Sequence, residues 1–300
     1  MALNRRVAFG IGCITLSGIL WGAMGTAVQF LFQVAQGFNP LDLVALRQIC
    51  AGLVFVTVAF CVRPKQMLSI FHDTRTFIDI LIGGVLIFST HYCFFEAIYY
   101  SNAGTGAIFL TLVPLMAAVW LSVTQHQQIG PIEVACFILA ALGVYLIVTD
   151  GNWATLQFSP MAILFGLLSA GIATAYNIQP LRATSKVGVV PVVAWGMLVG
   201  GFCGFLVGHP FSMPVTWNVT SIGLMAFIVL FGTVIAFWSF MEGLRSTSPV
   251  MAGLLNCMEP LSAFLFSIAL LGDKVGFWQL VGIGLVLANI CLLALAKARK

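Results

Sequence analysis

The sequence VMAGLLNCMEPLSAFLFSIALLGD, from Val250 to Asp273, is an apolar run that carries one central acid, Glu259, directly in front of Pro260. A carboxylate in the middle of an apolar segment is costly unless it faces water or a protein-lined interior. The proline has no N–H and therefore frees a backbone carbonyl one turn earlier. The stretch predicts a kinked membrane helix with a polar centre, which requires other helices around it.

The composition of the 300-residue chain is that of an integral membrane protein. Apolar residues make up 61% of it, charged residues 7%, and the mean hydropathy is +1.07. A soluble domain carries about 25% charged residues. Apolar runs of about 20 residues match helices that cross a bilayer, whereas barrel strands would be shorter and alternating. We therefore expect an all-α integral membrane protein.

The apolar runs predict ten transmembrane helices. Turn-forming pairs such as Asn39-Pro40 and Ser159-Pro160 mark the breaks between them. We expect the helices at residues 7–32, 41–61, 77–100, 104–123, 130–149, 159–181, 189–207, 219–243, 249–271 and 275–296.

The basic residues predict the topology. Ten spans place both termini on one side of the membrane, and eleven of the 13 Lys and Arg residues then fall on that side. Only Lys274 falls on the other side, and Arg47 lies inside the second span. The positive-inside rule therefore predicts cytoplasmic N- and C-termini. Because the basic residues sit at helix ends, we expect a lipid bilayer and no nucleic acid as the partner.

The two halves of the chain are related by an internal repeat. An ungapped offset of 146 residues pairs Pro114 with Pro260 and Glu96 with Glu242, and an offset of 148 relates the first helices. The latter pairs Gly18 with Gly166, Leu20 with Leu168, Thr26 with Thr174 and Ala27 with Ala175. Five spans per unit is an odd number, so the second unit must be inverted. We expect two inverted five-helix repeats, at residues 7–149 and 159–296, with a substrate site between them near the midplane.

Short motifs along the chain resemble the drug/metabolite transporter superfamily, specifically its EamA-type members with two five-helix repeats. The motifs are Leu20-Trp21-Gly22, Arg47 before Ala51-Gly52, Ser101-Asn102-Ala103-Gly104, Met258-Glu259-Pro260-Leu261, Leu271-Gly272-Asp273 and Gln279-Leu280-Val281-Gly282. Asp273 departs from the pattern of the family, which has glutamate there. The resemblance implies a multi-pass protein of the bacterial cytoplasmic (inner) membrane that exports small metabolites through a cavity lined by spans 1, 3, 4, 6, 8 and 9. Exporters of aromatic amino acids are the nearest functional analogy.

Glu259 is the first candidate for a substrate-binding residue. It could bind the ammonium group of a substrate or carry a coupling proton. Alternatively, it is a protonated acid that hydrogen-bonds a neighbouring helix and steadies the kink at Pro260. Asn256 lies three residues earlier on the same helical face and could orient either form.

Other polar and aromatic residues near the middle of spans are further candidates for the cavity wall. Core packing is the alternative for each of them. They are Trp21 in span 1, His91 and Tyr92 in span 3, Thr174, Tyr176 and Asn177 in span 6, and Trp238 in span 8.

A second set of residues has the features of gates and hinges. Glu96 and Glu242 lie near the ends of spans 3 and 8, on opposite membrane faces, where a solvated helix end is the simpler alternative. Glycines and prolines near the repeat prolines could act as hinges. The gate and hinge candidates are Glu96, Gly104, Pro114, Glu242, Gly253 and Pro260.

Two other features of the spans leave alternatives open. Arg47 could snorkel to the headgroups, pair with Asp42 or bind a substrate carboxylate. In span 7 a glycine recurs at every fourth position, which permits close contact inside the bundle or in a homodimer. These glycines are Gly196, Gly200, Gly204 and Gly208.

The sequence therefore predicts a monomeric or dimeric secondary transporter that exports amino acids or similar small metabolites by alternating access. A multidrug exporter of lipophilic cations is the nearest alternative, because Glu259 and aromatic rings could form an anionic stacking pocket. An intramembrane enzyme is a third reading, but the sequence has no H-E-x-x-H or Walker motif. We expect no catalytic residues, no metal and no cofactor.

Overall fold

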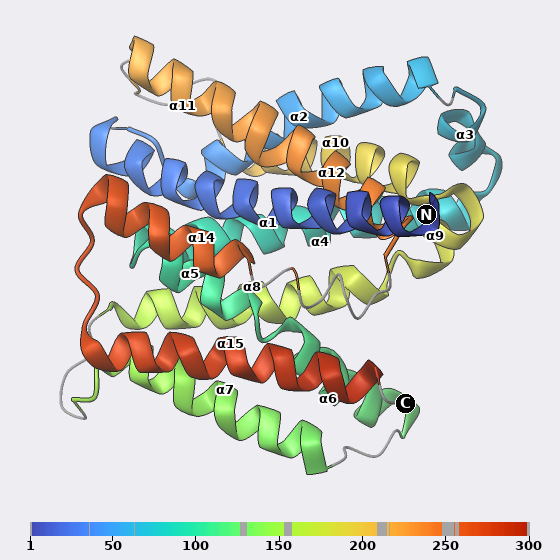
Figure 1. The fold of residues 1–300 in the computed structure, drawn as a ribbon. Helices are drawn as coiled ribbons and strands as arrows, with labels where there is room; N and C mark the ends of the chain where they lie inside the picture. Colours follow the sequence, from blue (N-terminus) through green and yellow to red (C-terminus); the bar gives the residue numbers. More distant parts are fainter. Residues whose placement is uncertain are drawn as a thin grey trace.

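The computed structural model is a bundle of helices that run roughly side by side (Figure 1). It describes residues 2–35, 37–62, 64–126, 131–152, 158–208, 215, 217–247, 255 and 258–298. The helices of the first half are α1 (Ala2–Val34), α2 (Pro40–Val62), α3 (Pro64–Ser69), η1 (Ile70–His72), α4 (Thr74–Tyr99), α5 (Ala103–Leu110), α6 (Val113–Gln125) and α7 (Pro131–Thr149). Those of the second half are α8 (Pro160–Ile178), α9 (Leu181–Val187), α10 (Val189–Val207), α11 (Val219–Val229), η2 (Leu230–Ile235), α12 (Ala236–Leu244), α14 (Met258–Phe266), η3 (Ser267–Leu271) and α15 (Phe277–Ala298).

The protein is an all-α membrane protein, as predicted. Within the described residues, seven helices are long and apolar enough to cross a membrane. Three shorter apolar helices, at Val134–Thr149, Met258–Leu271 and Phe277–Asn289, lie where the fifth, ninth and tenth spans are predicted. The total of ten spans and their inverted arrangement remain predictions.

The fourth predicted span is broken in two at its proline. Pro114 has no N–H to continue the hydrogen-bond ladder, and α5 ends at Leu110 before α6 begins at Val113. Thr174 of α8 donates a hydrogen bond to the carbonyl of Val113 over 3.3 Å. The same hydroxyl donates to the carbonyl of Ala170 in its own helix over 2.9 Å, so it is shared between α8 and the start of α6.

The threonines that the repeat pairs make similar contacts. Thr26 of α1 lies 3.4 Å from the carbonyl of Ala263 in α14, and Thr174 of α8 contacts Val113 at the start of α6. The first long helix of each half therefore packs against the proline-containing helix of the other half.

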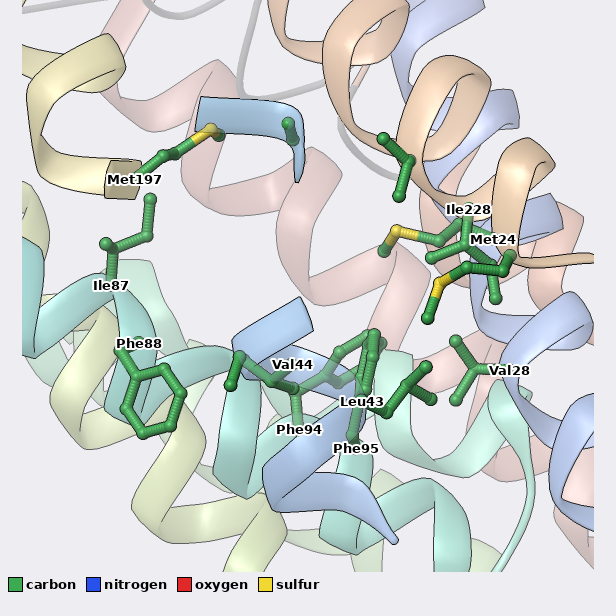
Figure 2. Close-up of a cluster of buried hydrophobic side chains, with 14 of the residues drawn as sticks. Met24, Val28, Leu43, Val44, Ile87, Phe88, Phe94, Phe95, Met197 and Ile228 are labelled. Carbon is green, nitrogen blue, oxygen red and sulfur yellow. The ribbon is translucent and has the colours of Figure 1, made fainter. Parts of the chain in front are cut away.

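Helix α10 packs against α2 and α4 through its glycines, and together they enclose much of the main core. A Cβ at Gly200 would lie 2.5 Å from Gln48 Oε1, and one at Gly204 would lie 2.3 Å from the ring of Phe88. The glycine face of span 7 therefore lies inside the bundle. Figure 2 shows part of the core, in which Met197 of α10 lies beside Ile87 of α4.

Ion pairs tie α9 to α4 at one end of the bundle. Arg182 pairs with Asp79 over 2.6 Å, and Lys186 pairs with Asp73 over 2.8 Å. Asp73 also caps α4 by accepting hydrogen bonds from Thr76. The hydrogen bond from Lys186, and next that from Thr76, hold the pKa of Asp73 well below its usual value.

We predict that Gly200→Ala destabilises the protein. The added Cβ would lie 2.5 Å from Gln48 Oε1 and 2.6 Å from the carbonyl oxygen of Gly84, and a backbone atom cannot move aside cheaply. Overpacking of this kind costs about 1–3 kcal/mol in the free energy of unfolding. Thermal unfolding in detergent measures it as a fall of about 2–4 °C in melting temperature for each kcal/mol.

Gly223→Ala is the matched control, because a Cβ at Gly223 meets nothing within 4 Å. Its melting temperature should stay the same or rise slightly, since alanine favours the helix. An equal fall in both variants would contradict the packing explanation.

Candidate functional site

A cavity of about 540 Å³ lies in the centre of the bundle. Its wall is formed by residues of α1, α4, α5, α6, α8, α9, α10, α12 and α14. These helices include the spans that the family resemblance implies, with α10 in addition. The volume is in the range of small-molecule sites.

One wall of the cavity is aromatic. The ring of Trp21 lies 5.2 Å from that of Phe237 and 5.2 Å from that of Phe240, between centroids. His91 meets Phe237 edge to face, with 6.3 Å between centroids. Such a surface can stack on an aromatic group or face a cation.

Glu259 lies in the wall at the start of α14, together with Pro260. Its backbone is held close to α1 because Gly22 has no side chain: a Cβ there would lie 2.6 Å from the carbonyl oxygen of Glu259. Ser262 bridges the same contact by donating to the carbonyls of Gly18 and Glu259. Glu259 is half-buried and lines the cavity, and its carboxyl has no hydrogen bond or ion pair to another described residue.

His91 is oriented by a fully buried glutamine. The amide nitrogen of Gln48 lies 2.9 Å from Nδ1 of His91 and 3.4 Å from the carbonyl of Ile87. When Nε2 carries the ring hydrogen, the amide donates to Nδ1, and His91 offers a donor to the cavity that it lines.

The other predicted residues fall into two groups. Tyr176, Asn177 and Pro114 line the cavity. The remaining three are outside its lining: Thr174 is buried and bonded to backbone carbonyls, Tyr92 stacks on Phe88 with 6.4 Å between centroids, and Trp238 is 37% exposed.

The gate and hinge candidates also differ in their surroundings. Glu242 forms an ion pair with Arg245 over 2.6 Å, and Glu96 is half-buried one turn before the end of α4. Gly104 lies against the ring of Phe264, where a Cβ would come within 2.4 Å. Gly253 and Asn256 lie outside the described residues. The binding and gating roles of all these residues stay predictions.

Arg47 departs from two of the sequence-based alternatives. It is fully buried, so it does not snorkel to the headgroups. It forms no ion pair with Asp42 or with another acid of the described residues. Its contacts are Met24 and Thr233, from α1 and η2.

At one end of the bundle, called the closed end below, a hydrogen-bond network that the sequence analysis missed joins α1, α5 and η3. Gln29 of α1 donates to the carboxylate of Asp273 over 2.8 Å and accepts from the backbone N–H of Ala103 over 2.7 Å. Ser267 also donates to Asp273. The signal in the sequence was a glutamine close to the end of an apolar helix.

The cavity extends toward the opposite end. Its lining there includes Leu181, Thr184 and Leu244, which neighbour Arg182 and Arg245. The structure thus has one closed end, at Gln29 and Asp273, and a cavity that reaches toward the end rich in basic residues.

Comparisons with known proteins concern the family and the fold of the chain. The model of the EamA-like transporter family matches residues 8–149 and again residues 160–295. The uncharacterized inner membrane transporter YicL of Salmonella typhimurium is 28% identical over 96% of this chain and 95% of its own. Protein PecM of Dickeya dadantii is 22% identical over 89% and 87%, and the uncharacterized inner membrane transporter YedA of Escherichia coli K12 is 20% identical over 93% and 88%. A crystal structure with 18% identity superposes with a TM-score of 0.65 over 99% of this chain and 98% of its own, which shows a shared fold.

We predict that Gln29→Leu loosens the closed end. Leucine has a similar size but makes neither hydrogen bond, and each bond contributes about 0.5–1.5 kcal/mol. Amides in the first turn of α5, residues 103–106, should then exchange with deuterium roughly tenfold faster. Hydrogen-exchange mass spectrometry in detergent measures this directly.

Gln179→Leu is the matched control, because Gln179 bonds the carbonyl of Asp79 in the opposite part of the bundle. That variant should leave exchange at residues 103–106 unchanged. Unchanged exchange in Gln29→Leu would show that the network does not hold this end closed.

Proposed function

The chain belongs to the EamA-like transporter family, and on that premise we propose that it exports amino acids or similar small metabolites by alternating access through the central cavity. As a member of this family it is a membrane transporter and not an enzyme. Its curated relatives are inner membrane transporters, and the chain is a multi-pass protein of that membrane.

The proposed architecture is two inverted five-helix repeats, at residues 7–149 and 159–296, with both termini in the cytoplasm. Two features support it. The family model matches the chain twice, and α1 and α8 make related contacts with the proline-containing helix of the other half. The basic residues on the terminal side favour cytoplasmic termini. Whether the protein acts as a monomer or a homodimer stays a prediction.

The observation that carries the proposed function is a central cavity with an acid and an aromatic wall, which extends away from the end joined by Gln29. Glu259 can pair with an ammonium group, Trp21 and the rings beside it can stack on an apolar side chain, and His91 can donate a hydrogen bond. A small amino acid presents groups of these three kinds. With cytoplasmic termini, this conformation is open toward the cytoplasm, as loading for export requires.

The cycle needs the closed end to open and the open end to close. The Gln29–Asp273 network would break when α14 and α1 separate at that end. The 148-residue offset pairs Gln29 with Asn177, which lines the cavity in this conformation. We propose that Asn177 makes the corresponding closing contact in the outward-open state, with Gly104, Pro114 and Pro260 near the bending points.

The multidrug alternative rests on the same acid and aromatic rings. Lipophilic cations would use Glu259 and Trp21, but they have no acceptor to offer His91. Competition separates the two readings: zwitterionic amino acids should displace a bound amino acid, and lipophilic cations should do so weakly.

The proposal predicts that Glu259→Gln impairs transport. In proteoliposomes preloaded with single amino acids, the wild type should exchange external for internal substrate. If Glu259 binds the ammonium group, exchange by the variant falls by about tenfold or more, since a hydrogen bond to a charged group contributes roughly 1.5–3 kcal/mol. If Glu259 instead carries a coupling proton, exchange persists but accumulation driven by a pH gradient is lost.

Asp79→Asn is the matched carboxylate-to-amide control, because Asp79 pairs with Arg182 outside the cavity. It should exchange like the wild type. Exchange of lipophilic cations but of no amino acid by the wild type would reject the proposed substrate. Normal exchange and accumulation by Glu259→Gln would return that residue to a structural role.

A further inference from the structure

Arg47 is a fully buried arginine in the middle of the bundle, and the described residues place no acid against it. Its Nη1 lies 3.1 Å from the sulfur of Met24 and 3.3 Å from the hydroxyl of Thr233. The ring of Phe95 lies 5.0 Å from its central carbon. A thioether, a hydroxyl and a ring face are weak partners for a buried cation, so its charge is poorly compensated.

The end of the guanidinium that Met24 contacts can hold a carboxylate. Nε and Nη2 of Arg47 have no hydrogen-bond partner among the described residues. Nη2 and Nη1, which contacts Met24 and Thr233, form the end of the planar guanidinium and point two hydrogens in nearly the same direction. A carboxylate binds such a pair with both oxygens, which is the strongest pairing that arginine makes.

One flexible side chain of the cavity wall contacts this arginine. Met24 lines the cavity and also accepts from Nη1 of Arg47. Methionine has three rotatable bonds and its sulfur is a weak acceptor, so a carboxylate could replace it at little cost. Figure 2 shows Met24 beside Val28 and Ile228, in the same cluster as Phe95.

The other partner of Arg47, Thr233, lies in a π-helical turn. In this turn, η2, the hydroxyl of Thr233 donates to the carbonyl of Ile228 over 2.8 Å. The hydroxyl hydrogen is therefore used, and the oxygen accepts from Arg47. Single π turns within α-helices are frequent at functional sites.

From these contacts we propose that Arg47 is the carboxylate-binding residue of the transport site, and that Met24 occupies its place when no substrate is bound. This rests on the proposed function and names its substrate class, a small zwitterion whose carboxylate pairs with Arg47 and whose ammonium group lies toward Glu259. Both residues lie beside α1: the backbone of Glu259 packs at Gly18 and Gly22, and the side chain of Arg47 contacts Met24, two residues after Gly22.

The test compares three ligands of one shape by thermal shift of the full chain in detergent. L-phenylalanine carries both charged groups, 3-phenylpropionate only the carboxylate and L-phenylalaninamide only the ammonium. Arg47→Gln should weaken the apparent affinity for the first two at least tenfold and leave the third within twofold of the wild type. Arg47→Lys keeps the charge but cannot bind a carboxylate with two parallel hydrogen bonds. Its affinity for the two carboxylates should lie between those of Arg47→Gln and the wild type.

Met24→Leu keeps the arginine and removes the sulfur acceptor. It should bind L-phenylalanine and 3-phenylpropionate several-fold more tightly than the wild type does, with L-phenylalaninamide unchanged. If Arg47→Gln does not fold, Met24→Leu serves as the test instead. An affinity of Met24→Leu for L-phenylalanine and 3-phenylpropionate equal to that of the wild type would overturn the proposal.

Other results would overturn it directly. One is no binding of either carboxylate by the wild type, and another is an equal loss of affinity for all three ligands in Arg47→Gln. A third is a rise in melting temperature with phosphatidylglycerol that exceeds the rise with the carboxylates and requires Arg47, which would assign the residue to a lipid headgroup. Counterflow of L-phenylalanine by the wild type is scored separately. If the wild type shows no counterflow but binds carboxylates through Arg47, amino-acid export is rejected and the carboxylate site stands. If Arg47→Gln shows normal counterflow, amino-acid export stands and the carboxylate site is rejected.

Discussion

Polar groups within an apolar bundle must find their partners inside the protein, and this constraint organises the structure. Hydrocarbon offers no hydrogen bonds, so an unpartnered polar group there is costly. Gln29 bonds both Asp273 and a helix terminus, Gln48 bonds His91, and Thr174 bonds a carbonyl beside the break at Pro114. Glu259 lines the cavity without a hydrogen bond to another described residue, and Nε and Nη2 of Arg47 are buried without one, next to Met24 of the cavity wall.

Close helix contact makes this arrangement possible. Glycines bring α10 onto α2 and α4, and Gly22 brings α1 onto the start of α14. These contacts fix the backbone on both sides of the cavity, so that Glu259 and His91 face it from opposite helices. The same closeness fills the bundle elsewhere, and the large side chains of the main core leave little free volume around Phe95 and Leu43. The central cavity lies beside this packed core.

The positions of the helices could be predicted from the sequence, but the faces that they turn inward could not. Helix bounds such as Val189–Val207 follow directly from apolar runs and turn residues. In a membrane protein, however, the lipid-facing and core-facing sides are both apolar, so periodicity says little about helix rotation. Trp21, His91 and Glu259 line the cavity, whereas Trp238 is exposed and Tyr92 stacks on Phe88, and the periodicity of the sequence does not separate the two groups. Gln29 was missed because its partner, Asp273, is 244 residues away.

The central claim is that this cavity serves one membrane face at a time. Distances between paired spin labels test it most directly: labels at Val34 and Lys274 report the end closed by Gln29, and labels at Leu181 and Leu244 report the end toward which the cavity extends. In lipid nanodiscs, saturating the protein with a substrate identified by counterflow should lengthen the first distance and shorten the second. Changes in the same direction at both ends, or none with a transported substrate, would contradict alternating access through this cavity.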